Sequence, residues 1–326
     1  MDVAAYLRGT ECDLGLSTAK EWVEAAKGDF VDCDLKDYLP ESWARSQFVF
    51  RGQKNSGWGL RPSLHRTIVA AGKPLTEANL ARAERAVISA AREGVGSSPH
   101  GVSKGSQLGL NLTDGQLLAL LQHQESPTRF LDVSMTGLIG LFFACEAEDR
   151  LDGRVFVVAL PADSSQDEAT SDYRAAKPWL RLNGDHDLPW PEVRTERNAN
   201  GDWTTSVCLV DAGGLDPRMS AQRGVFLVGG LARSYGGMTH YWSEQSRGLL
   251  AEEIAELTSL QIYHVTGRKR RMTQPFPAFA RTLRVPAELK SEIRRILEED
   301  HGIAQGSVYP DFAGFRRLAH NLAARA

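Results

Sequence analysis

Arg51 and Gly52 are the first residues whose types could do chemistry. They follow Gln47–Phe50, an aromatic and β-branched run that the glycine ends, which predicts a short strand delivering Arg51 to its C-terminal edge. A guanidinium at that edge offers a planar, bidentate clamp for a pyrophosphate, and Gly52 would let the ligand approach the backbone. The structural alternative for Arg51 is a buried ion pair with an acid such as Asp132.

A second cluster of polar side chains lies between Gln122 and Ser134. His123 could act as a general base or as a donor to a ribose, or it could be a structural residue at a helix end. Arg129 and Asp132, three residues apart, could pair on a turn or bracket a phosphate. Ser134 precedes an apolar segment, so its hydroxyl either caps a helix or faces a pocket.

Two further clusters and a basic run follow in the second half of the chain. Arg218–Phe226 places Gln222 just before a strand-like run, and Tyr309–Gly314, with the sequence YPDFAG, is expected mainly to anchor the C-terminal helix. The basic run consists of Arg268, Lys269, Arg270 and Arg271. With Phe276 and Phe279 after it, the run would suit single-stranded nucleic acid through phosphate neutralisation and stacking, although such runs are more often solvated turns.

Hydrophobic periodicity predicts the elements that must position these clusters. The pattern predicts helices at residues 77–93, 114–123, 136–145, 251–257 and 287–298. Runs rich in β-branched residues predict strands at residues 47–51, 154–160, 206–210, 224–230, 259–265 and 280–286. The helices and strands alternate irregularly, which favours an α+β fold over a repeated β-α-β arrangement.

The chain divides into a short lead-in and one large domain. Residues 1–40 carry a helical pattern that begins at Ser17 or Thr18, and residues 41–326 hold all the clusters. The polar stretch 163–205 reads as an insertion or lid between core strands.

Composition excludes several classes of protein. The 326 residues are 42% hydrophobic and 24% charged with a net charge of -3, which is typical of a globular protein and demands no nucleic-acid or membrane partner. The four cysteines are widely spaced and form no CxxC pair, so we expect no metal site and no disulfide framework. No export signal or membrane-spanning run is visible, so the cytoplasm is the expected location. Phosphate-loop, Rossmann and zincin motifs are absent from the sequence.

The four clusters, in their order along the chain, resemble the FRG domain family. Members of that family carry FRG, then QHxGxPTRxLD followed by xT or xS, then QxGxF, and finally a PDxxG element near the C-terminus. The likeness extends over roughly Gln47 to Leu318, which makes residues 41–326 an FRG-type domain by this resemblance. Three departures are Glu125 in place of the usual glycine, Val133 in place of an aromatic residue, and Ala313 in place of an acidic residue.

The resemblance further implies a core similar to that of ADP-ribosyltransferases, a mixed β core with surrounding helices. In that comparison Arg51 takes the position of the strand-borne Arg or His, Ser134 that of the hydroxyl residue before a helix, and Gln222 that of the final Glu or Gln. Arg51 would hold the pyrophosphate or the adenine-side ribose of NAD, Ser134 would orient the nicotinamide ribose, and Gln222 would bind its 2'-hydroxyl. The residues expected at the NAD site as a whole are Arg51, Gly52, Gln53, Thr128, Arg129 and Ser134, with His123 and Asp132 as further catalytic candidates.

A glutamine at the third position leaves the source of negative charge open. The oxocarbenium-like state that forms when the glycosidic bond of NAD ionises favours a nearby carboxylate, and Gln222 can only donate and accept hydrogen bonds. Either Gln222 suffices, or Asp132, Glu252 or Glu253 contributes the charge, or the site binds without turnover.

The resemblance therefore implies an NAD-consuming mono-ADP-ribosyltransferase that needs no metal. The acceptor would be a macromolecule, with RNA or DNA ahead of protein because of the basic run. FRG-type proteins resemble components of bacterial toxin and anti-phage defence loci, so a neutralising antitoxin is an expected partner. The alternative is a non-catalytic sensor that binds a nucleotide or nucleic acid in the same cleft.

Overall fold

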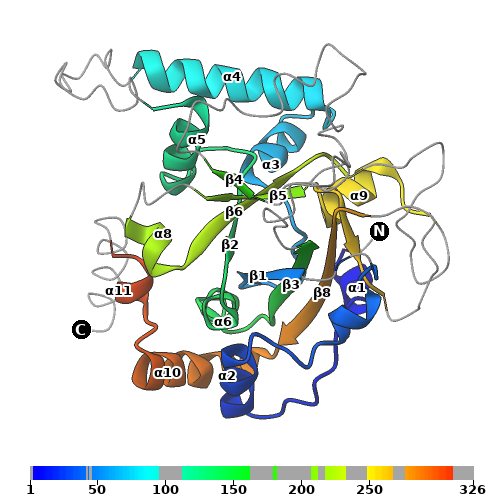
Figure 1. Cartoon of the computed structure of the whole chain (residues 1–326), viewed down its shortest axis with the longest axis vertical. Coiled ribbons are helices and arrows are strands. Elements are labelled where there is room, and N and C mark those ends of the chain that lie inside the picture. Colours follow the sequence, from blue (N-terminus) through cyan, green and yellow to red (C-terminus); the bar gives the residue numbers. More distant parts are fainter. Residues whose placement is uncertain are drawn as a thin grey trace, which may run out of the picture.

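A single eight-stranded sheet forms the centre of the molecule, and helices surround it (Figure 1). This computed structural model describes residues 3–41, 43, 46–94, 112–161, 179–181, 207–211, 217–232, 248–266 and 276–310. The mixture of helices with a mostly antiparallel sheet confirms the α+β class expected from the sequence.

The sheet has the strand order β4-β5-β6-β2-β1-β3-β8-β7. The strands are β1 (Ser46–Gln53), β2 (Leu131–Ser134), β3 (Gly153–Pro161), β4 (Trp179–Arg181), β5 (Val207–Asp211), β6 (Gly224–Gly229), β7 (Ile262–His264) and β8 (Ala278–Val285). The outer pairs β4–β5 and β7–β8 are parallel, and the other neighbours are antiparallel. The strands expected from β-branched runs are all present, whereas the four-residue β2 was not expected.

The described helices lie on both sides and at both ends of the sheet. They are α1 (Val3–Arg8), α2 (Ala19–Lys27), α3 (Ser63–Ala70), α4 (Glu77–Gly94), α5 (Asp114–His123), α6 (Gly137–Cys145), α8 (Pro217–Ala221), α9 (Ala251–Leu257), α10 (Lys290–His301) and α11 (Gln305–Val308), with 3-10 turns η1 (Asp34–Tyr38) and η3 (Ala287–Leu289). Thr18 begins α2 with a capping box closed by Glu21, as the Ser-Thr pair predicts. Among the described residues, no helix combines the length and apolar character needed to cross a bilayer.

Helix α6 packs directly on strand β1, and two glycines make this contact. A Cβ atom at Gly52 would lie 2.0 Å from the carbonyl oxygen of Gly140, and one at Gly140 would lie 2.8 Å from the Cβ atom of Phe50. No real Cβ contact is that short, so the backbones meet only because both residues lack side chains. The sequence assigned Gly52 to the approach of a ligand, but the packing of α6 already requires a glycine at that position.

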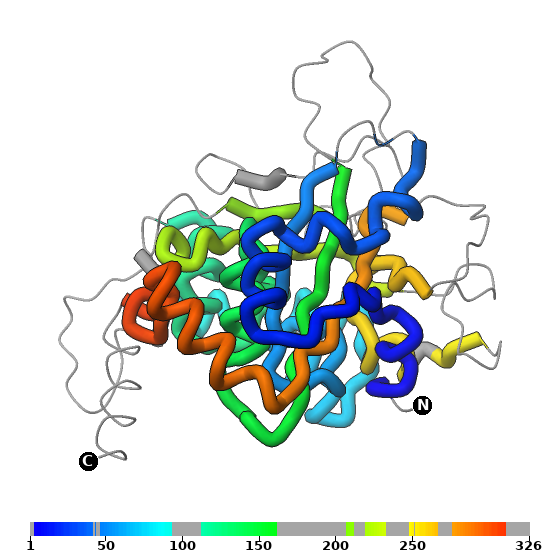
Figure 2. Tube along the Cα trace, turned by 90° about the horizontal axis from the view of Figure 1, so that it is seen from below, coloured from blue at the N-terminus to red at the C-terminus, as the bar shows by residue number. Residues whose placement is uncertain are grey.

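The N-terminal segment belongs to the same hydrophobic core as the sheet. Trp22, Val23 and Phe30 are buried together with residues of β1 and β3. Helix α2 lies alongside α10 and against α6, and Figure 2 shows the first of these contacts from below. The lead-in expected at residues 1–40 is thus packed into the structure that holds the large domain.

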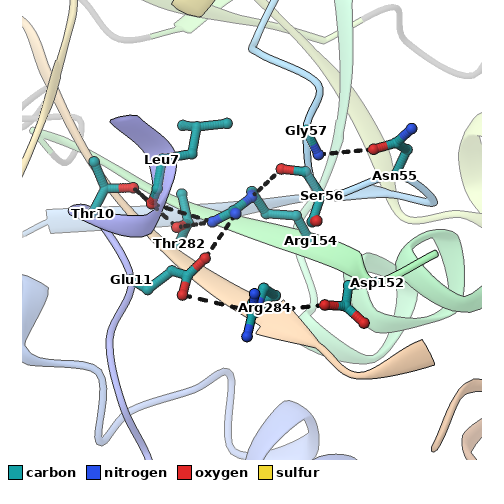
Figure 3. A network of polar contacts seen from close by, with 10 residues as sticks. All are labelled: Leu7, Thr10, Glu11, Asn55, Ser56, Gly57, Asp152, Arg154, Thr282 and Arg284. Atoms are coloured by element: carbon teal, nitrogen blue, oxygen red, sulfur yellow. Dashed lines mark hydrogen bonds and ion pairs between the residues drawn. The ribbon is translucent and has the colours of Figure 1, made fainter. Parts of the chain in front are cut away.

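A buried arginine ties this segment to the sheet (Figure 3). Arg154 of β3 is 1% exposed and donates from Nε to the carbonyl of Ser56 at 2.7 Å, and from Nη1 to the hydroxyl of Thr282 at 2.6 Å. Its Nη2 donates to Glu11 at 2.8 Å. Burial is the main reason why the pKa of Arg154 lies below its ordinary value, and Glu11 opposes that shift.

Candidate functional site

A cleft of about 460 Å³ lies against the middle of the sheet. It is lined by the C-terminal half of β1, the end of β2 and the start of β6, and by residues of α3, α5, α6 and α8. Seven of the nine residues that the resemblance assigns to NAD binding or catalysis line it, namely Arg51, Gly52, Gln53, His123, Asp132, Ser134 and Gln222. The fold therefore brings residues of all four sequence clusters to one place, because Tyr309 lines the cleft as well.

Arg51 reaches the cleft from β1 and is only partly paired. Its Nη1 donates to the backbone carbonyl of Asp132 at 2.5 Å, and the distance from Nη1 to the carboxylate oxygen Oδ2 of Asp132 is 3.9 Å. The Nε of Arg51 is buried and has no hydrogen-bond partner in the part of the chain that the structure describes. Burial lowers the pKa of Arg51 more than Asp132 raises it. The ion pair expected as the structural alternative exists, but it is long and leaves donors of Arg51 unused.

Asp132 is oriented by a glutamine that the sequence motif contains. Gln122 donates from Nε2 to Asp132 Oδ2 at 2.7 Å, and its Oε1 accepts from the Thr128 hydroxyl at 2.5 Å. Thr128 is fully buried and does not line the cleft, so its place is behind Gln122. The Asp132 side chain is 47% exposed, so it remains accessible to a ligand while Gln122 holds it.

Arg129 lies beneath the cleft and does not line it. It is 2% exposed and pairs with Glu77 at 2.7 Å and with Glu84 at 3.2 Å, both on α4. These ion pairs fix α4 to the start of β2. The structure therefore separates Arg129, which the sequence grouped with the NAD-binding residues, from the others.

Ser134 and Gln222 are held together by hydrogen bonds. The Ser134 hydroxyl donates to the Gln222 carbonyl at 2.9 Å and accepts from the backbone N–H of Thr136 at 3.2 Å. Gln222 in turn donates from Nε2 to the Val308 carbonyl at 3.1 Å. Ser134 stands opposite Phe50, the residue before Arg51, in the β1–β2 pairing. Thr136 occupies the N-cap of α6, so Ser134 supports the start of this helix without capping it and also lines the cleft.

His123 forms part of the cleft wall at the end of α5. It is 7% exposed, and its ring centroid lies 5.5 Å from that of Phe226 on β6. Packing against Phe226 holds the imidazole in one orientation. A structural histidine and a catalytic histidine both need a fixed orientation, so this contact is compatible with either role.

The segment between β1 and α3, together with the first half of α3, adds a basic and aromatic wall that sequence reasoning missed. Arg61, Arg66, Lys54 and Trp58 all line the cleft. Neither the Arg61 nor the Arg66 side chain makes a hydrogen bond or ion pair within the described residues, and burial, opposed by Glu256, lowers the pKa of Arg61. Trp58 is 47% exposed, and the ammonium group of Lys54 lies 6.0 Å from its ring centroid. The sequence signal that could have revealed this wall is the pair Arg61 and Arg66, which flank the first turn of the helix that follows β1.

Tyr309, which follows α11, forms part of the cleft wall. Its hydroxyl donates to Glu146 at 2.7 Å, and its ring lies edge-on to Phe143, 6.2 Å between centroids. The C-terminal helix that the YPDFAG element was expected to anchor lies outside the described residues, and so does the element itself from residue 311 onward.

Glu125 adopts a backbone conformation that favours glycine. Its φ angle is +60°, in the left-handed region, at the position where the FRG resemblance has glycine. The turn before Thr128 is therefore formed here with a glutamate, which also places a further carboxylate at the cleft.

Other residues that the sequence singled out fall elsewhere. Glu252 and Glu253 belong to α9 and do not line the cleft. The carboxylates that do line it are those of Asp132, Glu125 and Glu146. The basic run 268–271 lies outside the described residues.

Residues 46–153 match the FRG domain family model. This match spans about a third of the chain and includes β1, the Arg61–Arg66 wall, the Gln122–Ser134 cluster and the start of β3. It leaves Gln222 and Tyr309 outside. No curated protein and no solved structure matches the chain.

Proposed function

We propose that the cleft binds NAD and that the protein is an NAD-dependent mono-ADP-ribosyltransferase acting on a macromolecule. The observation that carries this proposal is the convergence of Arg51, Ser134 and Gln222, which come from three separate strands or turns, on one cleft. Their order and setting fit the three positions that the ADP-ribosyltransferase resemblance assigns to them.

Unused polar atoms in the cleft support the binding of a charged ligand. Arg51 Nε and Gln53 Oε1 are buried, and neither has a hydrogen-bond partner in the described ranges. A buried polar atom without a partner costs about 1–3 kcal/mol, which a ligand that supplies the missing contact recovers. A dinucleotide offers ribose hydroxyls to Gln53 and phosphate oxygens to Arg51.

The basic wall suits the remainder of a dinucleotide. The side chains of Arg61 and Arg66 carry two positive charges and make no close ion pair among the described residues, which matches the two charges of a pyrophosphate. The exposed ring of Trp58 offers a stacking surface for a base. Arg51 and this wall together would hold the ligand, while Ser134 and Gln222 orient the ribose whose bond to nicotinamide breaks.

Asp132 is the carboxylate we assign to stabilise the positive charge that develops on that ribose. It lines the cleft, is half exposed and is held by Gln122, whereas Glu252 and Glu253 lie outside the cleft. A carboxylate that is already oriented stabilises developing charge without reorganisation.

The non-catalytic alternative rests on the internal hydrogen bonds of the same residues. The Ser134 hydroxyl and the Gln222 amide nitrogen are both engaged with the chain itself. Such a site could bind a nucleotide without turning it over, as a sensor does.

We further propose that the acceptor is RNA or DNA ahead of protein, and that the protein acts as a toxin or effector in bacterial anti-phage defence with a neutralising partner. The support for the nucleic-acid acceptor is the basic run at residues 268–271 together with the basic wall of the cleft. The support for the defence role is the FRG resemblance alone.

The test is incubation with NAD labelled on the adenylate, in the presence of separate RNA, DNA and protein pools. We expect nicotinamide release and transfer of label to a nucleic-acid pool. Label appearing in the protein pool alone would reject the nucleic-acid acceptor and keep the transferase. If no pool is labelled and no nicotinamide is released while NAD still binds by calorimetry, the sensor alternative is correct.

Two variants of nearly unchanged side-chain shape test which residue supplies the negative charge that stabilises the ribose in the transition state. Asp132→Asn removes the carboxylate and should abolish nicotinamide release while NAD binding remains, because the amide keeps the shape of the side chain. Gln222→Glu adds a carboxylate at the third transferase position and should raise NAD hydrolysis. An unchanged rate in Asp132→Asn would reject Asp132 as the stabilising group.

A further inference from the structure

A pair of cysteines outside the cleft forms a second reactive place. The sulfur atoms of Cys12 and Cys33 and a carboxylate oxygen of Asp34 all lie within 4.8 Å of one another. Cys12 is partly exposed and Cys33 is buried, and neither residue lines the cleft. Wide spacing in the sequence gave no sign of this pair, because the chain returns through α2 to bring residue 33 back to residue 12.

The two thiols are not equivalent. A hydrogen bond from the thiol of Cys33 is the main reason why the pKa of Cys12 lies below its ordinary value, and the nearby Arg281 guanidinium acts in the same direction. The contact with Cys12, followed by burial, raises the pKa of Cys33. Cys12 is therefore the thiolate of the pair, and Cys33 remains a protonated thiol.

The third group of the cluster is already occupied. Both carboxylate oxygens of Asp34 accept from Arg281, Oδ1 from Nε at 2.7 Å and Oδ2 from Nη2 at 2.8 Å. A metal ion would have to break this bidentate pair to gain its third ligand, which disfavours a metal site and leaves thiol chemistry as the use of the pair.

Access to the buried thiol comes from a second cavity. Cys33 lines a hollow of about 220 Å³, which also borders on Phe50, Met135 and Val157. A small oxidant can therefore approach the pair from the exposed side of Cys12 or through this hollow.

We propose that Cys12 and Cys33 form an oxidation site that a hydroperoxide converts reversibly into an intramolecular disulfide. The Cys12 thiolate attacks the terminal peroxide oxygen, the O–O bond breaks, and an alcohol or water leaves after the released oxyanion takes a proton. The sulfur of Cys33 then attacks the Cys12 sulfenic acid, an S–S bond forms, and water leaves with the Cys33 proton. Two thiols and one hydroperoxide thus give one disulfide, one alcohol or water, and one further water.

The bond would close a loop within the N-terminal segment, next to the point where this segment is hydrogen-bonded to the sheet. The backbone N–H of Cys12 donates to the Thr282 carbonyl of β8 at 2.8 Å, and Cys33 directly follows the turn after α2. A disulfide between them closes a loop that contains α2, the helix that packs on α6 and α10. The sulfurs must approach to about 2.05 Å, which requires side-chain rotation.

The experiment treats the whole protein with hydrogen peroxide and then with dithiothreitol. We expect a mass decrease of two hydrogen atoms without dimerisation, a peptide that links Cys12 to Cys33, and recovery of the starting mass on reduction. The oxidised protein should melt higher by roughly 5 °C, because the closed loop restricts the unfolded chain. Cys145→Ala and Cys208→Ala are the matched controls and should oxidise as the wild type does, since burial raises the pKa of both thiols to about 12.

Variants of the pair separate the two steps. Cys33→Ser should stop at a Cys12 sulfenic acid that dimedone traps, and Cys12→Ser should form neither product. Because Cys33 is buried, a thermal melt of each reduced variant first establishes that the variant folds. Dimedone trapping in Cys33→Ser is then measured only on folded protein. Cys12→Ser tests independently whether Cys12 is the thiol that reacts with the peroxide. A peroxide-treated wild type without the linked peptide, or with dimedone on Cys33, overturns the proposal.

Discussion

The arginines of this protein fall into two groups that differ in how their donors are used. Arg154, in the sheet, donates from all three nitrogens to the backbone or to side chains of other segments (Figure 3). Within the part of the chain that the structure describes, Arg51 in the cleft keeps a buried Nε without a hydrogen-bond partner, and the side chains of Arg61 and Arg66 make no hydrogen bond or ion pair. The difference shows that burial alone does not identify a structural arginine; the use of its donors does.

The physical reason lies in the cost of burying a charge. A buried guanidinium is stable only when partners replace its water, and Arg154 has them within the fold. The cleft arginines keep part of their hydration because the cleft is open, so the fold can hold them ready for an anion. The two groups should therefore respond in opposite ways to mutation, one through stability and the other through binding.

Arg154→Met should give the largest loss of stability. The change removes the buried guanidinium that donates to Ser56, Thr282 and Glu11, and breaking an ion pair of a buried group costs about 3–5 kcal/mol. Urea unfolding of the two proteins measures this difference. The matched control is Arg284→Met, since Arg284 touches the same Glu11 and also Asp152 but is 47% exposed, and it should cost less than about 1 kcal/mol. Equal losses in the two variants would contradict the division between the groups.

Arg51→Met tests the other group. We expect NAD binding to weaken by about 2–3 kcal/mol, roughly 50-fold, because a charge-assisted hydrogen bond to the ligand is lost. The free energy of unfolding should change by no more than about 1 kcal/mol, since the link to Asp132 is a single hydrogen bond and a long ion pair. Calorimetry and urea unfolding give the two quantities. A large stability loss with unchanged binding would place Arg51 in the structural group.

Much of the fold could be predicted from local pattern. The β-branched runs of β1, β3 and β8 predicted strands, and the length of the apolar run 136–145 favoured the helix α6 over a strand. Strand β2 escapes this reasoning because its four residues are stabilised by pairing with β1 on one side and β6 on the other. The meeting of Arg51 with Ser134 and Gln222 followed from the order of the motifs.

The partners of individual side chains could not be predicted in the same way. The resemblance grouped Arg129 with the residues expected to bind NAD, but its carboxylate partners lie on α4, far upstream in the sequence. Arg154 opens a strand, where a charge usually faces water, and it is buried only because the N-terminal segment covers it. Such pairings depend on tertiary packing, which no local spacing encodes.

Two buried histidines predict how acid acts on the scaffold. Burial together with Arg129 lowers the pKa of His65 to about 3, and burial together with Arg154 lowers the pKa of His264 to about 3. The unfolded chain takes up these protons near its ordinary pKa of about 6.5, so stability falls as the pH decreases through that value, by about 1.4 kcal/mol per pH unit for each histidine.

The window between about pH 6.5 and 4.5 isolates this effect, because most carboxylates titrate below it. His264→Leu should halve the slope of the unfolding free energy against pH, measured by urea unfolding in that window. An unchanged slope would mean that His264 is already protonated in the fold beside Arg154.

Arg61→Gln and Arg66→Gln should have a smaller effect than Arg51→Met. Each variant should weaken NAD binding by about 1–1.5 kcal/mol, roughly tenfold, because it removes one charge from a partly open wall. The double variant should lose more than either single one, and the free energy of unfolding should stay within about 0.5 kcal/mol, because no described residue pairs with these side chains. The measurement is NAD titration by calorimetry at fixed salt. A stability loss in either variant would move that arginine into the group of Arg154.

Glu125→Gly should give the smallest effect and should increase stability. A residue other than glycine at φ +60° costs about 1–2 kcal/mol, and the extra freedom of glycine in the unfolded chain returns part of this, so a net gain of about 0.5–1 kcal/mol is expected. Glu125→Ala is the matched variant, because it also removes the carboxylate but keeps the strained backbone. The difference between the two variants in urea unfolding isolates the backbone contribution. If the glycine variant is no more stable than the alanine variant, the backbone at residue 125 carries no measurable strain, and the prediction is wrong.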